Sequence, residues 1–207
     1  MKMTDVTALI LAAGTSSRMG EPKQLLGLGG TPLLKRVIDA VLPCGFSEIV
    51  TVIGHEAERI QQAISIPDPR FRWVVNARYL SGQSTSLFTG LEVCRSASVM
   101  IFLGDEPLLS ERTVDVVFRA GLEQQALSDE PFAVRPSFQS VPGHPVFLGN
   151  VKKLDFSGLQ GDEGAKTILS SMEAMQFLPV GDRGVLFDVD TPEHYEKARQ
   201  IWMWEAT

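Results

Sequence analysis

The sequence has 207 residues, enough for one α/β domain with a full hydrophobic core and too few for two ordinary domains. Hydrophobic residues make up 44% of the chain and charged residues 21%, which is typical of a soluble globular protein. The net charge of -6, without any run of Lys and Arg, argues against nucleic acid as a partner, because phosphate backbones need a basic stripe.

The first predicted element is a strand at residues 6–11, an apolar segment that is too short for a signal sequence or a membrane span. Such a run is typical of a parallel strand that is covered on both faces. No apolar run in the sequence approaches the roughly 18 residues that a membrane span needs. We therefore expect a cytoplasmic protein that has no membrane partner.

Strand and helix patterns then alternate along the chain. Helical spacing of apolar residues begins after Pro32 and stops at Gly45, and Ser110 is expected to cap a later helix. The remaining strands are expected at residues 49–53, 71–75 and 99–103, and the remaining helices at residues 56–64 and 87–94. This alternation predicts an α/β fold with a doubly wound, mainly parallel sheet and helices on both faces.

The pattern changes between residues 131 and 148, where Pro and Ser predict a cross-sheet excursion with an antiparallel strand near residues 146–148. A helix near residues 163–172, a late strand at 176–180 and a final helix from Thr191-Pro192 complete the expected elements. No repeat or linker interrupts the chain, so we expect one domain over residues 1–207. Cys44 and Cys94 lie in apolar patterns and are expected to be buried thiols, not a disulfide or a metal pair.

Ligands of an open α/β sheet bind beyond the carboxyl ends of its strands, which here selects the loops at residues 12–24, 76–86 and 104–109. The first loop combines small residues with Arg18 and Lys23. Small residues let backbone N–H groups converge on an anion, and the two side chains supply charge for a triphosphate. The loop is neither a P-loop nor a dinucleotide fingerprint. Its alternative interpretation is a solvated loop with incidental charges.

Hydroxyl and acidic side chains follow the later strands. The hydroxyl groups of Ser84, Thr85 and Ser86 either cap the next helix or form a polar pocket for a base edge or a phosphate at its N-terminus. Asp105 and Asp190 each follow an apolar stretch, where carboxylates are suited to Mg²⁺ beside phosphate oxygens. The alternatives are a turn before a proline for Asp105 and, for the second acidic cluster, a helix cap by Asp190 or Thr191.

The run from residue 11 to residue 24 resembles the N-terminal signature of nucleotidyltransferases that activate sugars, isoprenoid precursors and the molybdenum cofactor. The continuation Pro22-Lys23-Gln24-Leu25-Leu26, followed by Leu28-Gly29-Gly30, is similar to the molybdenum cofactor cytidylyltransferases. The form Ala12-Ala13-Gly14 looks like the cytidylyl-transferring branch, because the guanylyl-transferring branch usually has a second glycine at Ala13. The resemblance implies a Rossmann-like nucleotidyltransferase fold.

The resemblance also assigns residues to a nucleotide and metal site. Gly82-Gln83-x-x-Ser86-Leu87 is similar to the family's base-contacting motif, and Gly104-Asp105-x-Pro107 and Asp190-Thr191-Pro192 match its metal-binding motifs. Asp188 alternates with Asp190 and is expected to point the other way along a strand. The implied catalytic residues are Arg18, Lys23 and Asp105, and the implied Mg²⁺ ligands are Asp105 and Asp190. The implied nucleotide-binding residues are Leu11, Ala12, Ala13, Gly14, Ser16, Arg18, Lys23, Gly82 and Ser86.

A further motif implies the acceptor side. Gly143-His144-Pro145-Val146 is similar to the molybdenum branch, where Arg135 is expected to accompany it, although a lone histidine is often structural. The resemblance implies that His144 and Gln83 bind the acceptor. Residues 160–166 resemble another acceptor element. Glu106 differs from the Gln or Met that is more frequent at its place, which leaves the metal site intact and alters the expected acceptor contacts.

The implied reaction is the Mg²⁺-dependent transfer of CMP from CTP to the terminal phosphate of molybdopterin, with release of pyrophosphate and a molybdoenzyme as the downstream client. One alternative is a guanylyl transferase for the same pterin, against which Ala13 argues. Another is a cytidylyl transferase for a different phosphorylated or sugar acceptor. An alternative from a different class is a carrier that binds the finished molybdenum cofactor without catalysis, and the retained charged residues argue against it.

Overall fold

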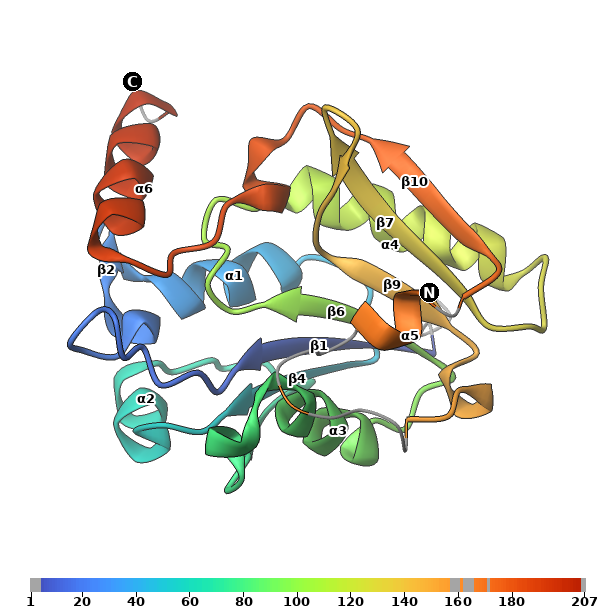
Figure 1. Ribbon diagram of the computed structural model, residues 1–207, viewed down its shortest axis with the longest axis horizontal. Helices are drawn as coiled ribbons and strands as arrows, with labels where there is room; N and C mark the ends of the chain where they lie inside the picture. Colours follow the sequence, from blue (N-terminus) through green and yellow to red (C-terminus); the bar gives the residue numbers. More distant parts are fainter. Residues whose placement is uncertain (1–4, 157–160, 162–165, 171, 206–207) are drawn as a thin grey trace.

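The computed structural model describes residues 5–156, 161, 166–170 and 172–205. The strands of its main sheet are β1 (Val6–Ala12), β4 (Glu48–Ile53), β5 (Phe71–Val75), β6 (Ser98–Leu103), β7 (Phe132–Phe138), β8 (Val141–Pro142), β9 (Val146–Gly149) and β10 (Met175–Pro179). Their order is β10-β7-β9-β6-β1-β4-β5, with β8 paired to β7 (Figure 1). β1 is parallel to β4 and β6, whereas β9 is antiparallel to β6 and β7. The mainly parallel sheet expected from the sequence is confirmed.

Helices cover both faces of this sheet, as expected. The α-helices of the described residues are α1 (Leu33–Val41), α2 (Ala57–Ala63), α3 (Gln83–Val93), α4 (Glu111–Gln125), α5 (Lys166–Ser170) and α6 (Pro192–Glu205). Side chains of β1 alternate between the two faces. Ala8 and Ile10 join the apolar cluster that includes residues of α1, α2 and α4, and Leu9 and Leu11 join the cluster that includes residues of α3 and α5. Within the described ranges, no helix combines the length and the apolar character that a membrane crossing needs.

The structure differs from the expected elements in two places. The residues just after the first loop form a small hairpin of β2 (Gly27–Leu28) and β3 (Thr31–Pro32). Its turn is made by Gly29 and Gly30, whose φ angles of 58° and 80° are left-handed values that favour glycine. The expected cross-sheet excursion contains a full strand, β7, which Pro136 concealed in the sequence pattern. The antiparallel strand and the late strand expected after it are present as β9 and β10.

Helix α6 fastens the C-terminal segment to the β2–β3 hairpin. Leu28 of the hairpin shares a buried cluster with Val189 and with Ala198 of α6. Tyr195 Oη donates a hydrogen bond to Gly27 O at 2.6 Å. Figure 1 shows α6 standing directly above β2, at the end of the sheet where the strand β1 finishes. The segment just before α6 is therefore held near the carboxyl ends of the central strands.

Both cysteines are free thiols, as expected from the sequence. Cys44 is buried, and Cys94 is half-buried at the end of α3. Burial is the main reason why the pKa of Cys44 rises to about 11 and that of Cys94 to about 12. Neither thiol is therefore a reactive thiolate near neutral pH.

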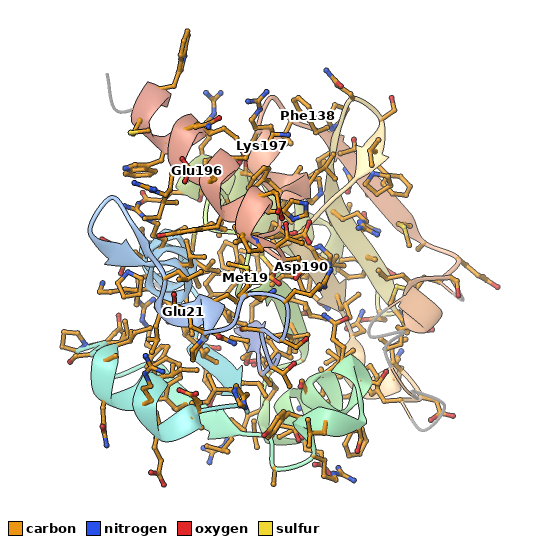
Figure 2. All side chains as sticks on the ribbon, turned by 60° about the vertical axis from the view of Figure 1, so that its left-hand side comes forward. Met19, Glu21, Phe138, Asp190, Glu196 and Lys197 are labelled. Carbon is orange, nitrogen blue, oxygen red and sulfur yellow. The ribbon has the colours of Figure 1, made fainter. Side chains whose placement is uncertain are left out.

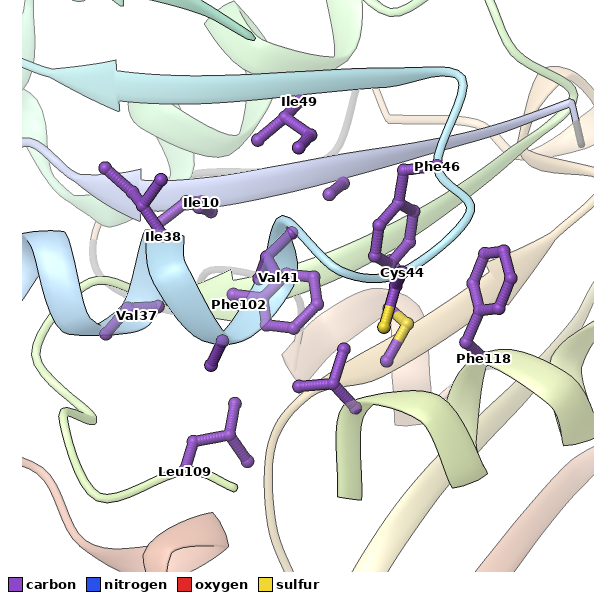
Figure 3. Close-up of a cluster of buried hydrophobic side chains, with 14 of the residues drawn as sticks. Ile10, Val37, Ile38, Val41, Cys44, Phe46, Ile49, Phe102, Leu109 and Phe118 are labelled. Atoms are coloured by element: carbon purple, nitrogen blue, oxygen red, sulfur yellow. The ribbon is translucent and has the colours of Figure 1, made fainter. Parts of the chain in front are cut away.

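The fully buried Phe102 packs its ring against the edge of Phe46 at a centroid distance of 6.0 Å (Figure 3). Phe102→Ala removes this apolar contact and leaves a cavity, so it should lower the free energy of unfolding by about 3 to 5 kcal/mol. Urea denaturation measures the change. The control Val116→Ala, on the exposed side of α4, should change it by less than about 0.5 kcal/mol. Equal effects of the two substitutions would contradict the central position of Phe102 in the core.

Candidate active site

A cavity of about 820 Å³ lies beyond the carboxyl ends of β1 and β6. Every residue that the sequence assigns to the nucleotide or the metal lines this cavity, with the exception of Ser16, and Gln83 lines it as well. The assigned residues found there are Leu11, Ala12, Ala13, Gly14, Arg18, Lys23, Gly82, Ser86, Asp105 and Asp190. The structure thus brings together side chains from three loops and from the segment before α6.

Further residues line the cavity that were not predicted as nucleotide or metal ligands. They are Thr15, Gln24, Tyr79, Leu80, Ser81, Leu103, Gly104 and Gly161. Tyr79 and its two successors form a short turn, η2 (Tyr79–Ser81), inside the loop that the strand-end rule had selected. These residues could have been predicted from their place in that loop. The contact of Gly161 with the first cavity could not, because Gly161 comes from a distant part of the chain.

Lys23 lies between the two predicted metal ligands. Its Nζ donates to Asp105 Oδ2 and to Asp190 Oδ1, each at 2.6 Å. The side chain is only 12% exposed. Burial opposes the charge of the ammonium group, but the two carboxylates outweigh burial and raise the pKa of Lys23 above its ordinary value. The carboxylates of Asp105 and Asp190 are therefore held close together by their shared contact with Lys23 Nζ.

Arg18 brings a second positive charge to the same place. Its Nη2 donates to Asp190 Oδ2 at 3.0 Å, while the side chain is 66% exposed. Burial favours the neutral form of Asp190, but Lys23 and Arg18 outweigh burial, and the pKa of Asp190 falls below its ordinary value. An exposed pair of this kind adds little stability, so the guanidinium group can turn toward a phosphate at small cost.

Asp190 reaches Asp105 through a backbone contact. Val189 N donates to Asp105 O at 2.9 Å, so the segment before α6 runs alongside the end of β6. Figure 2 shows Asp190 next to Met19 of the first loop, below α6. This backbone contact holds the Asp105 and Asp190 segments side by side without the help of a ligand.

Of the two residues predicted as the alternative cap of α6, Asp190 and Thr191, it is Thr191 that caps the helix. Thr191 Oγ1 accepts a hydrogen bond from His194 N at 3.2 Å, at the start of α6. Asp190 is therefore available to Lys23. Asp188, which was expected to point the other way, lines a second cavity and not the first.

Gln24 and Ser16 hold the first loop in shape. Gln24 is 3% exposed, and its Nε2 donates to Ala12 O at 2.8 Å and to Gly14 O at 3.1 Å. Ser16 Oγ accepts a hydrogen bond from Lys23 N at 3.0 Å. Ser16 was expected to bind the nucleotide, but its hydroxyl group is used inside the loop. The structure therefore makes Gln24, which had no assigned role, the main brace of this loop.

The hydroxyl residues after β5 do not cap α3. The N-cap of α3 is Gly82, without a side-chain cap, and Ser84 and Ser86 are buried within the first turn. Asn76 Nδ2 donates to Ser86 Oγ at 3.0 Å and to Thr85 Oγ1 at 2.9 Å. The capping interpretation is therefore wrong, because these hydroxyl groups link the helix to the end of β5 instead.

Gly161 belongs to residues 160–166, which were predicted as an acceptor element. It lines the first cavity, and its carbonyl oxygen accepts a hydrogen bond from Ser84 N at 3.0 Å. A Cβ at Gly82, whose φ is 105°, would lie 2.4 Å from Gly161 O, so only glycine fits there. Residues 160 and 162–165 lie outside the described part. Of the helix expected near residues 163–172, the structure describes α5 at Lys166–Ser170.

A second cavity of about 390 Å³ adjoins the first. The two cavities share Gln83, Leu103, Asp105 and Asp190. His144 and Arg135 line the second cavity, together with Glu106 and Asp188. The two residues predicted for the acceptor, Gln83 and His144, therefore both line the second cavity, and Gln83 lines the first cavity as well.

The second cavity contains buried charged groups. Glu106 is 3% exposed, and its Oε1 lies 3.4 Å from His144 Nδ1. Burial raises the pKa of Glu106 to about 7, against the opposing effect of His144. Burial also raises the pKa of Asp188 and lowers that of Arg135, whose Nε donates to Gly143 O at 3.0 Å.

Comparisons with known proteins support a nucleotide-binding interpretation of this region. Residues 8–175 match the family described as the MobA-like NTP transferase domain. The purine catabolism protein PucB of Bacillus subtilis is 30% identical over 97% of the chain and 98% of its own length. Nicotine blue oxidoreductase of Paenarthrobacter nicotinovorans is 30% identical over 91% of the chain and 93% of its own length.

Two further matches show the limits of the likeness. The chain spans 34% of the length of a bifunctional GlmU protein from Symbiobacterium thermophilum, to which it is 29% identical over 74% of its own residues. A crystal structure of Rv0371c from Mycobacterium tuberculosis H37Rv in complex with manganese has the same fold, with a TM-score of 0.75. That likeness covers 95% of this chain and 99% of Rv0371c at 24% identity.

Gln24→Glu tests the brace of the first loop. The change removes the amide donor and places a carboxylate oxygen against the carbonyl oxygens of Ala12 and Gly14, so it should lower the free energy of unfolding by about 1 to 3 kcal/mol. Urea denaturation measures this loss, and hydrogen exchange should show faster exchange in the first loop. The same change at the exposed Gln62 of α2 is the control, and it should have an effect below about 0.5 kcal/mol. Equal stability of the two variants would contradict the role of Gln24.

Proposed function

We propose a reaction for this chain, which belongs to the MobA-like NTP transferase domain family: it transfers CMP from CTP to the terminal phosphate of molybdopterin and releases pyrophosphate. The membership confirms the family predicted from the sequence, and the chain carries a nucleotidyltransferase domain. One observation carries the proposal. Asp105 and Asp190, from distant parts of the chain, meet at Lys23 beside a loop of small residues that is suited to phosphates.

A divalent cation fits between Asp105 and Asp190. Lys23 Nζ serves as a stand-in, because it already lies 2.6 Å from one oxygen of each carboxylate. The described residues include no group of three or more His, Cys, Asp or Glu that would enclose a metal ion. Two carboxylates completed by phosphate oxygens and water are the usual surroundings of Mg²⁺. The manganese complex of the similar Rv0371c also supports a divalent cation.

The bound Mg²⁺ would neutralise charge on the triphosphate. The chain's own residues would position the phosphates and stabilise the transition state. Lys23 and Arg18 would pair with the phosphate oxygens and stabilise charge on the α-phosphoryl group and on the leaving pyrophosphate. The acceptor phosphate would attack the α-phosphorus in line, so that no covalent intermediate with the protein is needed. Catalysis is then a matter of positioning and charge neutralisation.

The nucleotide and the acceptor would approach the carboxylate pair from opposite sides. The first cavity takes the triphosphate and the base, with Ala13 favouring cytosine by resemblance to the cytidylyl branch. The second cavity takes the acceptor, and Gln83 lies in the wall between them. This arrangement would bring an acceptor phosphate against the α-phosphate at the carboxylate pair.

Pyrophosphate release with each of the four nucleoside triphosphates, with and without molybdopterin, tests the proposal. We expect release with CTP only when molybdopterin and Mg²⁺ are present. Preference for GTP would identify a guanylyl transferase. Tight binding of molybdopterin without pyrophosphate release at any Mg²⁺ concentration would identify a carrier and contradict the proposal.

Asp105→Ala should lower kcat by on the order of 10²-fold, because it removes an electrostatic partner of the transition state. The control is Asp129→Ala at an exposed position after α4. It changes the net charge equally and should leave kcat unaltered. Steady-state pyrophosphate release measures both variants, and normal turnover by Asp105→Ala would remove this residue from the mechanism.

Lys23→Met should have opposite effects on the metal and on the nucleotide. Without the ammonium group, the two carboxylates lose their competing cation, so Mn²⁺ should bind on the order of tenfold more tightly in the absence of nucleotide. The KM for CTP should rise, because a phosphate partner is lost. Mn²⁺ titration followed by electron paramagnetic resonance measures the first effect. Lys35→Met on α1 is the control, and unchanged or weaker Mn²⁺ binding by Lys23→Met would contradict the shared site.

A further inference from the structure

Two buried side-chain atoms in the described ranges have no hydrogen-bond partner: Thr51 Oγ1 and Glu106 Oε2. Thr51 lies within β4 and lines neither the first nor the second cavity. Glu106 lines the second cavity. An unpaired buried carboxylate oxygen costs more than an unpaired hydroxyl group, because charge and polarity are both withdrawn from water. Its presence beside a cavity indicates that a ligand supplies the missing donor.

The other carboxylate oxygen of Glu106 is occupied by a histidine in a fixed position. His144 Nδ1 lies 3.4 Å from Glu106 Oε1. The backbone of His144 is tied down, because its N donates to Val185 O at 2.9 Å. A Cβ at the preceding Gly143 would lie 2.2 Å from the same Val185 O, so the two segments approach as closely as glycine permits. The imidazole therefore holds one oxygen and leaves Oε2 for a partner from outside the protein.

The position of Glu106 connects this free oxygen to the acceptor. Glu106 directly follows Asp105, which lines both cavities. An acceptor whose phosphate reaches the carboxylate pair from the second cavity has the rest of its molecule next to Glu106. Arg135, in the same cavity, adds a positive group that suits an anionic acceptor. An ionised carboxylate oxygen only accepts, so an acceptor that binds the ionised form of Glu106 must offer an N–H or an O–H group.

We propose that Glu106 selects the acceptor by accepting a hydrogen bond from an N–H or O–H group of a phosphorylated substrate, and that His144 is the positioning residue for its carboxylate. The inference rests on the proposed function and assigns a role to a buried carboxylate that the proposed reaction does not use. A pterin would supply N–H donors and a sugar phosphate would supply O–H donors. Both would supply the hydrogen-bond donor that Glu106 Oε2 lacks.

Glu106→Met tests the proposal, because methionine has a similar volume and no acceptor oxygen. We expect the KM for the acceptor to rise on the order of tenfold or more, with the KM for CTP within about twofold of wild type. The melting temperature should stay equal or rise, since an unpaired buried polar atom is removed. Glu106→Gln, which retains one acceptor oxygen, should partly restore the KM for the acceptor. Thr51→Val removes the other unpaired atom and should leave both KM values unchanged.

Pyrophosphate release with molybdopterin in one arm and glucose 1-phosphate in the other distinguishes the two kinds of donor. A KM effect of Glu106→Met with molybdopterin assigns the N–H group, and an effect with glucose 1-phosphate assigns the O–H group. An acceptor KM within about twofold of wild type overturns the role of Glu106, as does a parallel rise of both KM values with a lower melting temperature. No pyrophosphate release by the wild type with either acceptor contradicts the proposed function itself, and the role of Glu106 falls with it.

Discussion

The contact of Lys23 Nζ with Asp105 and Asp190 is the interaction on which the rest of the site depends. Two carboxylates that face one small volume repel each other unless a cation lies between them. The ammonium group supplies that cation and so ties the loop after β1, the end of β6 and the segment before α6 into one arrangement. A triphosphate with its metal ion needs the same charges in the same place, so the proposed reaction requires an exchange of partners and little movement of the backbone.

Packing of the sheet makes this contact possible. β1 and β6 are parallel neighbours, so their carboxyl ends open at the same edge of the sheet. Gly104 N donates to Leu11 O at 2.8 Å, and a Cβ at Gly104 would lie 2.7 Å from Ala12 Cβ. The loop carrying Asp105 therefore lies directly against the first loop. On the other side, the buried cluster around α6 holds the Asp190 segment against the end of β6.

The two adjoining cavities give the carboxylate pair a different neighbour on each side. Small residues and positive charge line the first cavity, as a triphosphate requires. Buried side chains that can recognise shape and hydrogen-bond donors line the second, with Glu106 held by His144. If the nucleotide binds in the first cavity and the acceptor in the second, as proposed, the reaction takes place at the wall that both cavities share. The choice of acceptor then depends on residues that do not touch the triphosphate. Variation of the acceptor is then possible without disturbance of the nucleotide site.

The sequence by itself determined most strands and helices of the first half, the loops at the strand ends and the charged residues within them, because apolar runs and helical spacing are local patterns. It concealed β7 behind a proline, and it revealed neither the brace by Gln24 nor the links of Thr85 and Ser86 to Asn76. These contacts depend on hydrogen bonds between residues that lie apart in the sequence. Only the tertiary structure decided that Lys23 meets Asp190, a residue 167 positions away. Such a meeting depends on packing between distant elements, which no local pattern records.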